Sequence, residues 1–345
     1  MPTPETLPHT VEKVGTNLQK TMTLVLLATL PGALALVWFY GWGIVINWLL
    51  AISTALVVEA AVLKLRQLPL TPSLSDGSAL VSATLLVLAL PPYLPWWLTL
   101  LATSFALLCG KHLFGGIGKN PFNPAMLGYA MALVSFPQHM SHWPSSHGLN
   151  LLGGLQQTFG LNLGSTPPPD AWAQATALDA LRINKSLTVD ELFAGNPSFG
   201  RFGGRGAEWF NLAFLAGGAF LLWQRVFTWH APVGMLGSLF VISLLCWNGS
   251  GSDSHGSPLF HLLTGASMLG AFFIVTEPVS GPKSPQARLL FGSGVGLITY
   301  VIRTWGGYPD GVAFAVLLMN LAVPALERLE RIKPGGETEK TGAVP

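Results

Sequence analysis

The chain has 345 residues, of which 50% are hydrophobic and only 10% are charged. Soluble domains carry roughly 25% charged residues, so the composition excludes an ordinary soluble domain and predicts a membrane protein. The formal net charge of +2 is too small to indicate a nucleic-acid partner. The two cysteines lie inside apolar runs without a CxxC motif, and the sequence therefore predicts no metal site.

The apolar runs predict ten membrane-spanning helices, because one span needs about 20 predominantly apolar residues. A polar tail, 1–20, precedes the first run, and a long apolar run behind it argues against a cleavable signal peptide. The predicted spans lie near residues 21–41, 44–63, 77–92, 95–110, 122–137, 207–224, 232–248, 259–276, 286–302 and 311–327. The expected fold class is an all-α polytopic membrane protein.

The positive residues predict the orientation of the chain. An even number of spans places both termini on one side, and thirteen of the eighteen Lys and Arg residues fall on that side. Because positive residues are enriched in cytoplasmic loops, we expect cytoplasmic termini, and we expect the long loop 138–206 to lie on the outer side of the membrane.

The two groups of spans share a pattern, in which a Gly-Gly pair leads into a helix that ends near a proline. The two instances are Gly115-Gly116 before Pro137 and Gly306-Gly307 before Pro324. Two groups of five spans predict inverted repeats, although small residues and prolines are also common in membrane helices generally. The predicted units are a tail 1–20, a first repeat 21–137, a loop 138–206, a second repeat 207–328 and a cytoplasmic tail 329–345.

The loop contains the unusual segment Asp170-Ala-Trp-Ala-Gln-Ala-Thr-Ala-Leu-Asp-Ala-Leu-Arg182. The hydroxyl of Thr176 stands between two alanines, which leave it uncrowded and accessible to a modifying enzyme. The alternative is a simple helix cap, with Thr176 at the N-cap and Asp179 at the third helical position.

Three segments resemble the NqrB/RnfD family. Gly115-Gly-Ile-Gly-Lys-Asn-Pro-Phe-Asn-Pro-Ala-Met126 is similar to that family's GGxGxNPFNPAM signature, and the segment 306–317 resembles its last helix. Gln174-Ala-Thr176 resembles the flavin attachment site of the family. The resemblance covers roughly residues 20–330, and this length favours the RnfD (RsxD) branch. The departures from the pattern are Lys119, Ala173, Ala177 and Glu277, where the family usually has glutamine, serine, proline and aspartate.

The resemblance implies a flavoprotein that carries FMN, esterified through its phosphate to Thr176 by a flavin transferase, which also makes the chain a phosphoprotein. It implies a translocase subunit that couples ferredoxin/NAD electron transport to ion transport, together with RnfA, RnfB, RnfC, RnfE and RnfG. A second, non-covalent flavin, riboflavin, is part of the same expectation. The alternatives are an NqrB-type subunit of a sodium-pumping NADH:quinone reductase and a non-redox channel or transporter for small solutes. The chain has no dinucleotide fingerprint, and no catalytic residue is predicted.

Acidic residues near the membrane are candidates for an ion or proton pathway. Glu59 is the one acid deep inside an apolar run, and an intramembrane carboxylate is costly enough to suggest a function. The alternative is a carboxylate that reaches the cytoplasmic boundary near Lys64. Asp76 and Glu277 lie at helix ends, where a capping role is the alternative. The two Asn-Pro steps of 119–125 predict either a broken backbone that binds a ligand or a rigid helix start.

Overall fold

The computed structural model describes residues 7–116, 118–144, 148–161, 168–308 and 310–331. The ends of both predicted tails, 1–6 and 332–345, lie outside the described residues. The first half contains α1 Leu7–Tyr40, α2 Gly43–Leu65, α3 Leu70–Ser75, α4 Ser78–Ala89, α5 Trp96–Leu107, the π-helix η1 Leu108–His112 and α6 Pro124–Ser135. The second half contains α12 Ala207–Trp223, α13 His230–Leu245, α14 Pro258–Leu262, α15 Ser267–Leu269, the π-helix η2 Gly270–Ile274, α16 Pro285–Trp305 and α17 Val312–Arg331.

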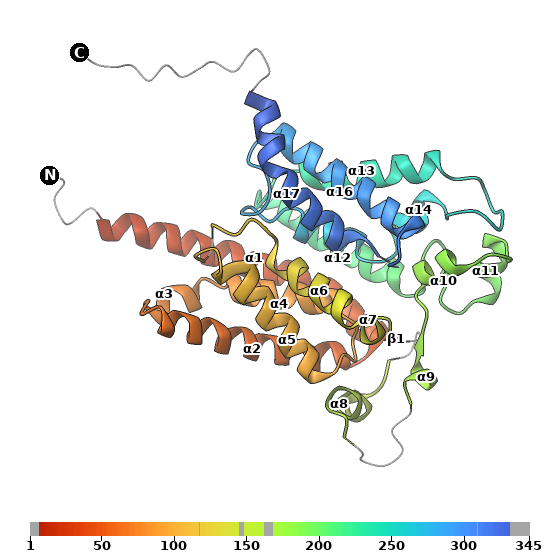
Figure 1. Ribbon diagram of the computed structural model, residues 1–345, viewed down its shortest axis with the longest axis horizontal. Helices are drawn as coiled ribbons and strands as arrows, with labels where there is room; N and C mark the ends of the chain where they lie inside the picture. Colours follow the sequence, from red (N-terminus) through yellow and green to blue (C-terminus); the bar gives the residue numbers. More distant parts are fainter. Residues whose placement is uncertain (1–6, 117, 145–147, 162–167, 309, 332–345) are drawn as a thin grey trace.

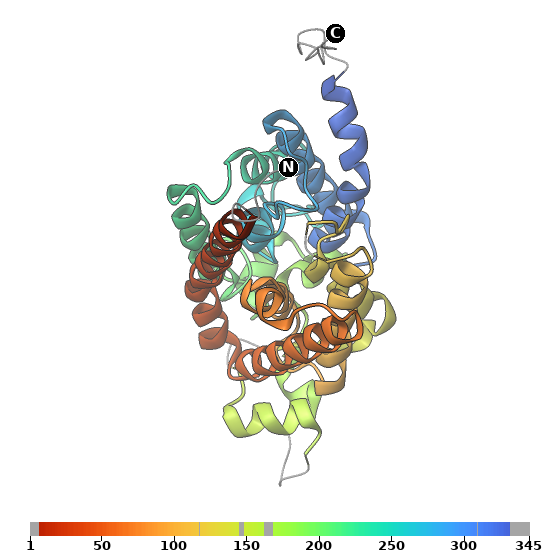
Figure 2. The same ribbon diagram turned by 90° about the vertical axis from the view of Figure 1, so that its left-hand side faces the viewer.

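The two halves lie side by side, with the connecting loop at one end (Figure 1). Turned by 90°, the second half lies above the first (Figure 2). The start of α1 and the end of α17 lie toward the end opposite α10 and α11 (Figure 1). Helix α1 packs along α12, and α6 contacts α17. One large apolar core, which includes Leu86, Met126, Phe214 and Val316, extends through both halves.

All ten predicted spans fall on helical segments. Within the described ranges, three helices are long and apolar enough, by length and composition, to cross a membrane: Leu18–Tyr40, Gly43–Leu65 and Val312–Leu329. Four shorter apolar helices are α4, α6, α12 and α13. The prediction of a helical membrane protein is therefore confirmed, and the number of ten crossings stays a prediction.

Three boundaries differ from expectation. Helix α1 begins at Leu7, inside the predicted tail, because Pro8 falls in the first turn, where proline is tolerated. Helix α17 continues through Pro324 to Arg331, since a proline inside a membrane helix can be accommodated by its neighbours. The predicted span 259–276 is not one helix but is interrupted between α14 and α15, where Gly265 has a φ of 65°.

The loop between the halves is largely structured. It contains α7 Pro137–Met140, β1 Trp143–Pro144, α8 Leu151–Phe159, α9 Pro169–Trp172, β2 Ala173–Gln174, α10 Ala177–Ile183 and α11 Val189–Gly195. The two short strands pair antiparallel, with Trp143 opposite Gln174. Leu178 and Leu181 of α10 pack with Phe199 and Phe260 in a small core of their own. This core fastens the loop to the second half, because Phe260 belongs to α14.

Candidate functional site

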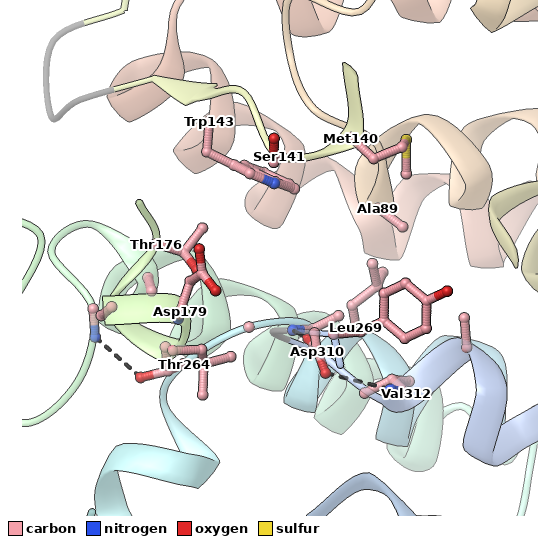
Figure 3. Close-up of a pocket in the computed structure, with 18 of the residues that line it drawn as sticks. Ala89, Met140, Ser141, Trp143, Thr176, Asp179, Thr264, Leu269, Asp310 and Val312 are labelled. Atoms are coloured by element: carbon pink, nitrogen blue, oxygen red, sulfur yellow. Dashed lines mark hydrogen bonds between the residues drawn. The ribbon is translucent and has the colours of Figure 1, made fainter. Parts of the chain in front are cut away.

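A cavity of about 280 Å³ lies where the loop meets both halves. Its walls come from three regions of the sequence, and Figure 3 shows them facing one another. Ala89, Met140 and Trp143 form one wall, and Thr176 with Asp179 lies across the gap (Figure 3). The remaining labelled residues of the second wall are Thr264, Leu269, Asp310 and Val312.

Thr176 lies at the start of α10 and lines this cavity. It is the N-cap of α10, and its hydroxyl oxygen accepts a hydrogen bond from the Asp179 N–H at 3.2 Å. The helix cap that the sequence offered as the alternative to a modification site is therefore present. Capping and modification are compatible, because the Thr176 oxygen stays in place when it is esterified. Thr176 as a whole is half-buried, and it faces the gap between the two walls of the cavity (Figure 3).

The segment that presents Thr176 is held from both sides. Gln174 pairs with Trp143 through the two short strands, and the Ser198 hydroxyl donates to the Ala175 carbonyl at 2.7 Å. Strand pairing fixes which side chains of an extended segment face the same way. Thr176 is therefore presented by a fixed backbone, although the surrounding segment is a loop.

Arg182 is one of two arginines that line this cavity among the described residues, the other being Arg205. The Nη2 of Arg182 binds the Asp179 carboxylate at 2.6 Å, and its Nη1 donates to the Gly306 carbonyl at 3.2 Å. The Nε–H of Arg182 is buried and has no hydrogen-bond partner within the described part of the chain. A guanidinium has five N–H donors and no acceptor, and Arg182 lines the cavity as a charged side chain of this kind.

The wall from the second half is built around the break between α14 and α15. The Thr264 hydroxyl accepts a hydrogen bond from the Gly204 N–H at 3.0 Å. The Asp310 carboxylate accepts from the Ala266 N–H at 2.8 Å and from the Val312 N–H at 3.3 Å. The sequence singled out the segment of Asp310 only as a resemblance, because nothing local to it indicates that it meets Thr264.

The residues of the cavity suit a flavin mononucleotide. The cavity is mostly apolar with a few convergent polar groups, and its volume is near the lower end of the range for small-molecule pockets, about 300–1,000 Å³. Trp143 and Tyr308 offer aromatic faces, Thr176 offers a hydroxyl for the phosphoester, and the Arg182 guanidinium lines the cavity as a cation that suits a phosphate. No group of three His, Cys, Asp or Glu side chains is placed to hold a metal ion in the described ranges.

Glu59 belongs to a second site, which lies in the first half of the chain near the end of α2. Glu59 is fully buried, so it does not reach the aqueous boundary beside the exposed Lys64. Its carboxylate binds Lys111 Nζ at 2.7 Å, His112 Nε2 at 2.9 Å and the Ser73 hydroxyl at 2.9 Å. The sequence did not indicate this pairing, because Lys111 lies 52 residues away at the end of another apolar run.

Asp76 and Glu277 are both close to this cluster. Asp76 is linked to Lys111 through Ser78, and Glu277 lines the same small cavity as Lys111. Asp76 accepts hydrogen bonds from the N–H and the hydroxyl of Ser78, at 2.7 and 2.6 Å, and Lys111 Nζ also donates to that hydroxyl at 2.9 Å. Glu277 accepts hydrogen bonds from the Asn120 amide at 3.2 Å and from the Ser280 hydroxyl. Ser78, Lys111, Asn120 and Glu277 all line a cavity of about 60 Å³.

The Asn-Pro segment joins the two halves. Pro124 stands in the first turn of α6, and the Asn123 side chain caps that helix through the Met126 N–H at 3.1 Å. The rigid helix start expected as one alternative is therefore confirmed. The Asn123 N–H also donates to the Asn320 side chain of α17 at 3.1 Å, which ties the first half to the second.

The fold and the two sites define a polytopic helical membrane protein that has a cavity between its halves and a buried charge cluster. The chain matches the model of the NQR2, RnfD, RnfE family over residues 5–336, and it belongs to that family. It is 62% identical to the D subunit of the ion-translocating oxidoreductase complex of Ectopseudomonas mendocina, over 96% of this chain and 95% of that protein.

Two other relatives carry the same name. The protein of Pseudomonas aeruginosa strain UCBPP-PA14 is 64% identical, over 91% of each chain. The protein of Cellvibrio japonicus is 48% identical, over 89% of this chain and 87% of its own length. The expected family and the expected branch within it are confirmed by these similarities.

Proposed function

We propose that this chain is the RnfD-type component of a redox-driven ion-translocating oxidoreductase complex and carries FMN on Thr176. The observation that supports this most directly is the position of Thr176, whose hydroxyl lines a cavity between two halves of a family member. In that role the bound flavin would supply the electron-transfer chemistry, and the protein would position it and adjust its potential. The chain would act as a translocase subunit without a complete active site of its own.

The residues around Thr176 have separate tasks in this proposal. The Thr176 oxygen would take the flavin phosphate from a flavin nucleotide that carries it in a phosphoanhydride bond. A flavin transferase from the outer side would form the ester as the Thr176 hydroxyl loses its proton and the other phosphate leaves. The positive charge of Arg182, which lines the cavity, would favour the flavin phosphate there, while the salt bridge to Asp179 keeps the guanidinium in place. The apolar walls exclude water from the remainder of the ligand.

The resemblance to Rnf systems supports the remaining components of the proposal. RnfA, RnfB, RnfC, RnfE and RnfG would supply the other redox centres and the nucleotide site, and the complex would lie in the bacterial inner membrane. A second flavin, riboflavin, stays a prediction. The NqrB-type alternative is weakened because the similar proteins are named as D subunits of the ion-translocating oxidoreductase complex. A channel without a flavin is the alternative that experiment must exclude.

The helix pairings support two inverted five-helix repeats. In the first half α2 packs against α4 and α5, and α5 packs against α6. In the second half α13 packs against α14 and α16, and α16 packs against α17. The contacts between the halves also match, because α1 meets α12 and α6 meets α17. An interrupted helix beside a cavity is typical of membrane proteins built from such repeats.

The buried charge cluster is our proposed ion or proton pathway. Glu59 and Asp76 are linked through Lys111 and Ser78, and Glu277 lies on the same small cavity as Lys111. Charged groups inside a membrane are costly and mark ion or proton paths by default. The cluster lies between α2, η1 and the segment after η2, so it includes both halves.

The test of the proposal is the fluorescence of the denatured protein band under ultraviolet light. The Thr176→Ala variant is expected to lose the covalent flavin signal and to retain membrane insertion, because only the acceptor oxygen and one cap are removed. A cap is worth about 1 kcal/mol, which is too little to unfold the protein.

A matched control separates capping from attachment. Thr188 caps α11, another seven-residue helix of the same loop, and its side chain accepts from the Glu191 N–H at 3.3 Å. Thr188→Ala therefore loses an equivalent cap, and its band is expected to fluoresce as the wild type does. A fluorescent Thr176→Ala band, or a wild-type band without fluorescence, contradicts the proposed function.

A further inference from the structure

Arg303 is a buried cation of α16 that binds the interrupted helix of the second half. Its side chain has no exposed surface. Its guanidinium donates to the carbonyls of His261 and Thr264 at 2.8 and 3.2 Å, and to the Ser267 hydroxyl at 3.0 Å. It also forms an ion pair with Asp310, at 3.1 Å. These polar contacts of Arg303 are all directed at the break or at Asp310.

The Arg303–Asp310 pair forms hydrogen bonds with backbone groups on both sides of the break between α14 and α15. The His261 and Thr264 carbonyls belong to the end of α14, where a helix leaves carbonyl groups without partners. The Ala266 N–H stands on the other side of the break, and it donates to Asp310 at 2.8 Å. The cation therefore serves the carbonyls and the carboxylate serves the N–H, which stabilises a backbone that could not otherwise remain buried.

Of the two charged side chains of this pair, only Asp310 lines the cavity. Asp310 lines the cavity together with Thr264 and Thr176, and 18% of its side-chain surface is exposed. Arg303 does not line the cavity and lies behind the carboxylate, with no exposed surface. Figure 3 shows Asp310 on the same wall as Thr176 and Thr264. Of these two charges, only the negative one of Asp310 therefore faces a ligand in the cavity.

We propose that the carboxylate of Asp310, held in place by Arg303, lowers the reduction potential of the flavin in this cavity. The inference rests on the proposed function of Thr176. Reduction adds negative charge to a flavin, and a carboxylate on the cavity wall disfavours that charge in a poorly screened interior. Arg303 offsets part of this effect, because it lies close behind the carboxylate.

Because the two charges have opposite signs, removing one or the other is expected to shift the midpoint potential of the flavin in opposite directions. Asp310→Asn keeps the size of the side chain and an oxygen that accepts from the Ala266 N–H, but it removes the negative charge and leaves Arg303 uncompensated. Both changes favour the reduced flavin, so the midpoint potential is expected to rise. Arg303→Gln leaves the carboxylate uncompensated, and the potential is expected to fall.

The measurement is a spectroelectrochemical titration of the flavin in the purified complex, after its covalent attachment has been checked by in-gel fluorescence. At fixed potential we expect the oxidised-to-reduced ratio to change by about tenfold in Asp310→Asn, the size expected for a unit charge acting through a partly screened interior. Asp310→Glu and Arg303→Lys keep the charges and are expected to stay near the wild-type potential.

The outcomes separate the two proposals. A fluorescent Asp310→Asn variant with the wild-type midpoint potential overturns the inference. A shift of the potential in the same direction in Asp310→Asn and Arg303→Gln overturns it as well. A purely structural role of the pair gives no reason for the shift to follow the sign of the charge. Where Asp310→Asn does not assemble, a fall of the potential in Arg303→Gln supports the inference and a rise overturns it. A wild-type band without fluorescence overturns the proposed function itself, and this inference with it.

Discussion

At the scale of the residue, Glu59 illustrates how a buried charge is retained. The carboxylate has no exposed surface, and it is bound by Lys111, His112 and Ser73 at 2.7–2.9 Å. Two charges taken out of water cost several kcal/mol each, and their attraction offsets this only when the geometry is good. Removal of Glu59 or Lys111 would therefore leave the other charge buried without the opposite charge that compensates it, although its remaining hydrogen bonds stay.

The stability of variants at this pair follows from the burial of both charges. Glu59→Gln leaves the Lys111 ammonium buried beside a neutral amide, so we expect a loss of about 3–5 kcal/mol in the free energy of unfolding. Lys111→Met is expected to cost a similar amount. The double variant removes both charges and is expected to regain most of this stability. Thermal unfolding in detergent measures all three.

Ion transport provides the second measurement on the same variants. If the cluster is part of the pathway, the double variant is stable, retains its flavin and moves fewer ions per electron. Ser73→Ala removes one hydrogen bond and no charge, so it serves as the control, with a cost of about 1 kcal/mol. Normal ion transport in an assembled double variant removes Glu59 and Lys111 from the mechanism.

At the scale of the element, glycines set how closely the helices of the second half approach. A Cβ atom added to Gly292 of α16 would overlap the Ala231 carbonyl of α13, and one added to Gly296 would overlap the Met235 carbonyl. Small residues at helix interfaces are the usual means of close packing in membranes, where there is no hydrophobic driving force between helices. Gly292 therefore keeps α13 and α16 in backbone contact.

Gly292→Ala is expected to separate α13 from α16 and to lower the melting temperature in detergent. Overpacking of a tight contact costs typically about 1–3 kcal/mol. Gly237→Ala is the matched control, because Gly237 is also a helical glycine of α13 and a Cβ there meets nothing within 4 Å. Equal melting temperatures for the two variants would show that the Gly292 contact does not limit stability.

The sequence predicted the helices better than their interruptions. Long apolar runs mark spans whatever their partners are, so all ten segments were found on helical structure. The interruption after α14 depends on Arg303, which lies about 40 residues further along the chain and whose contacts no local pattern indicates. The same reason explains the candidate sites: the Thr176 segment was predicted, whereas Lys111 and the Asp310 wall were not.

At the scale of the whole molecule, the long loop and the end of the last helix lie toward opposite ends of the fold (Figure 1). Loop residues Val189 and Asp190 are hydrogen-bonded to Ser250, which follows α13. At the other end, the Lys283 N–H reaches the Glu327 carboxylate near the end of α17, at 3.4 Å. Loop 138–206 and the end of the last helix therefore belong to opposite ends, as expected if one is periplasmic and the other cytoplasmic.

The last prediction tests this orientation with two cysteines at exposed positions. In a background where Cys109 and Cys246 are replaced by alanine, Ser186→Cys is expected to react with an impermeant maleimide in intact spheroplasts. Lys283→Cys is expected to react only after the membrane is permeabilised, because positive residues favour the cytoplasmic side. Both side chains are exposed, so a difference in labelling reports the side of the membrane. The reverse pattern would place Thr176 in the cytoplasm, and the flavin transferase would then have to act there.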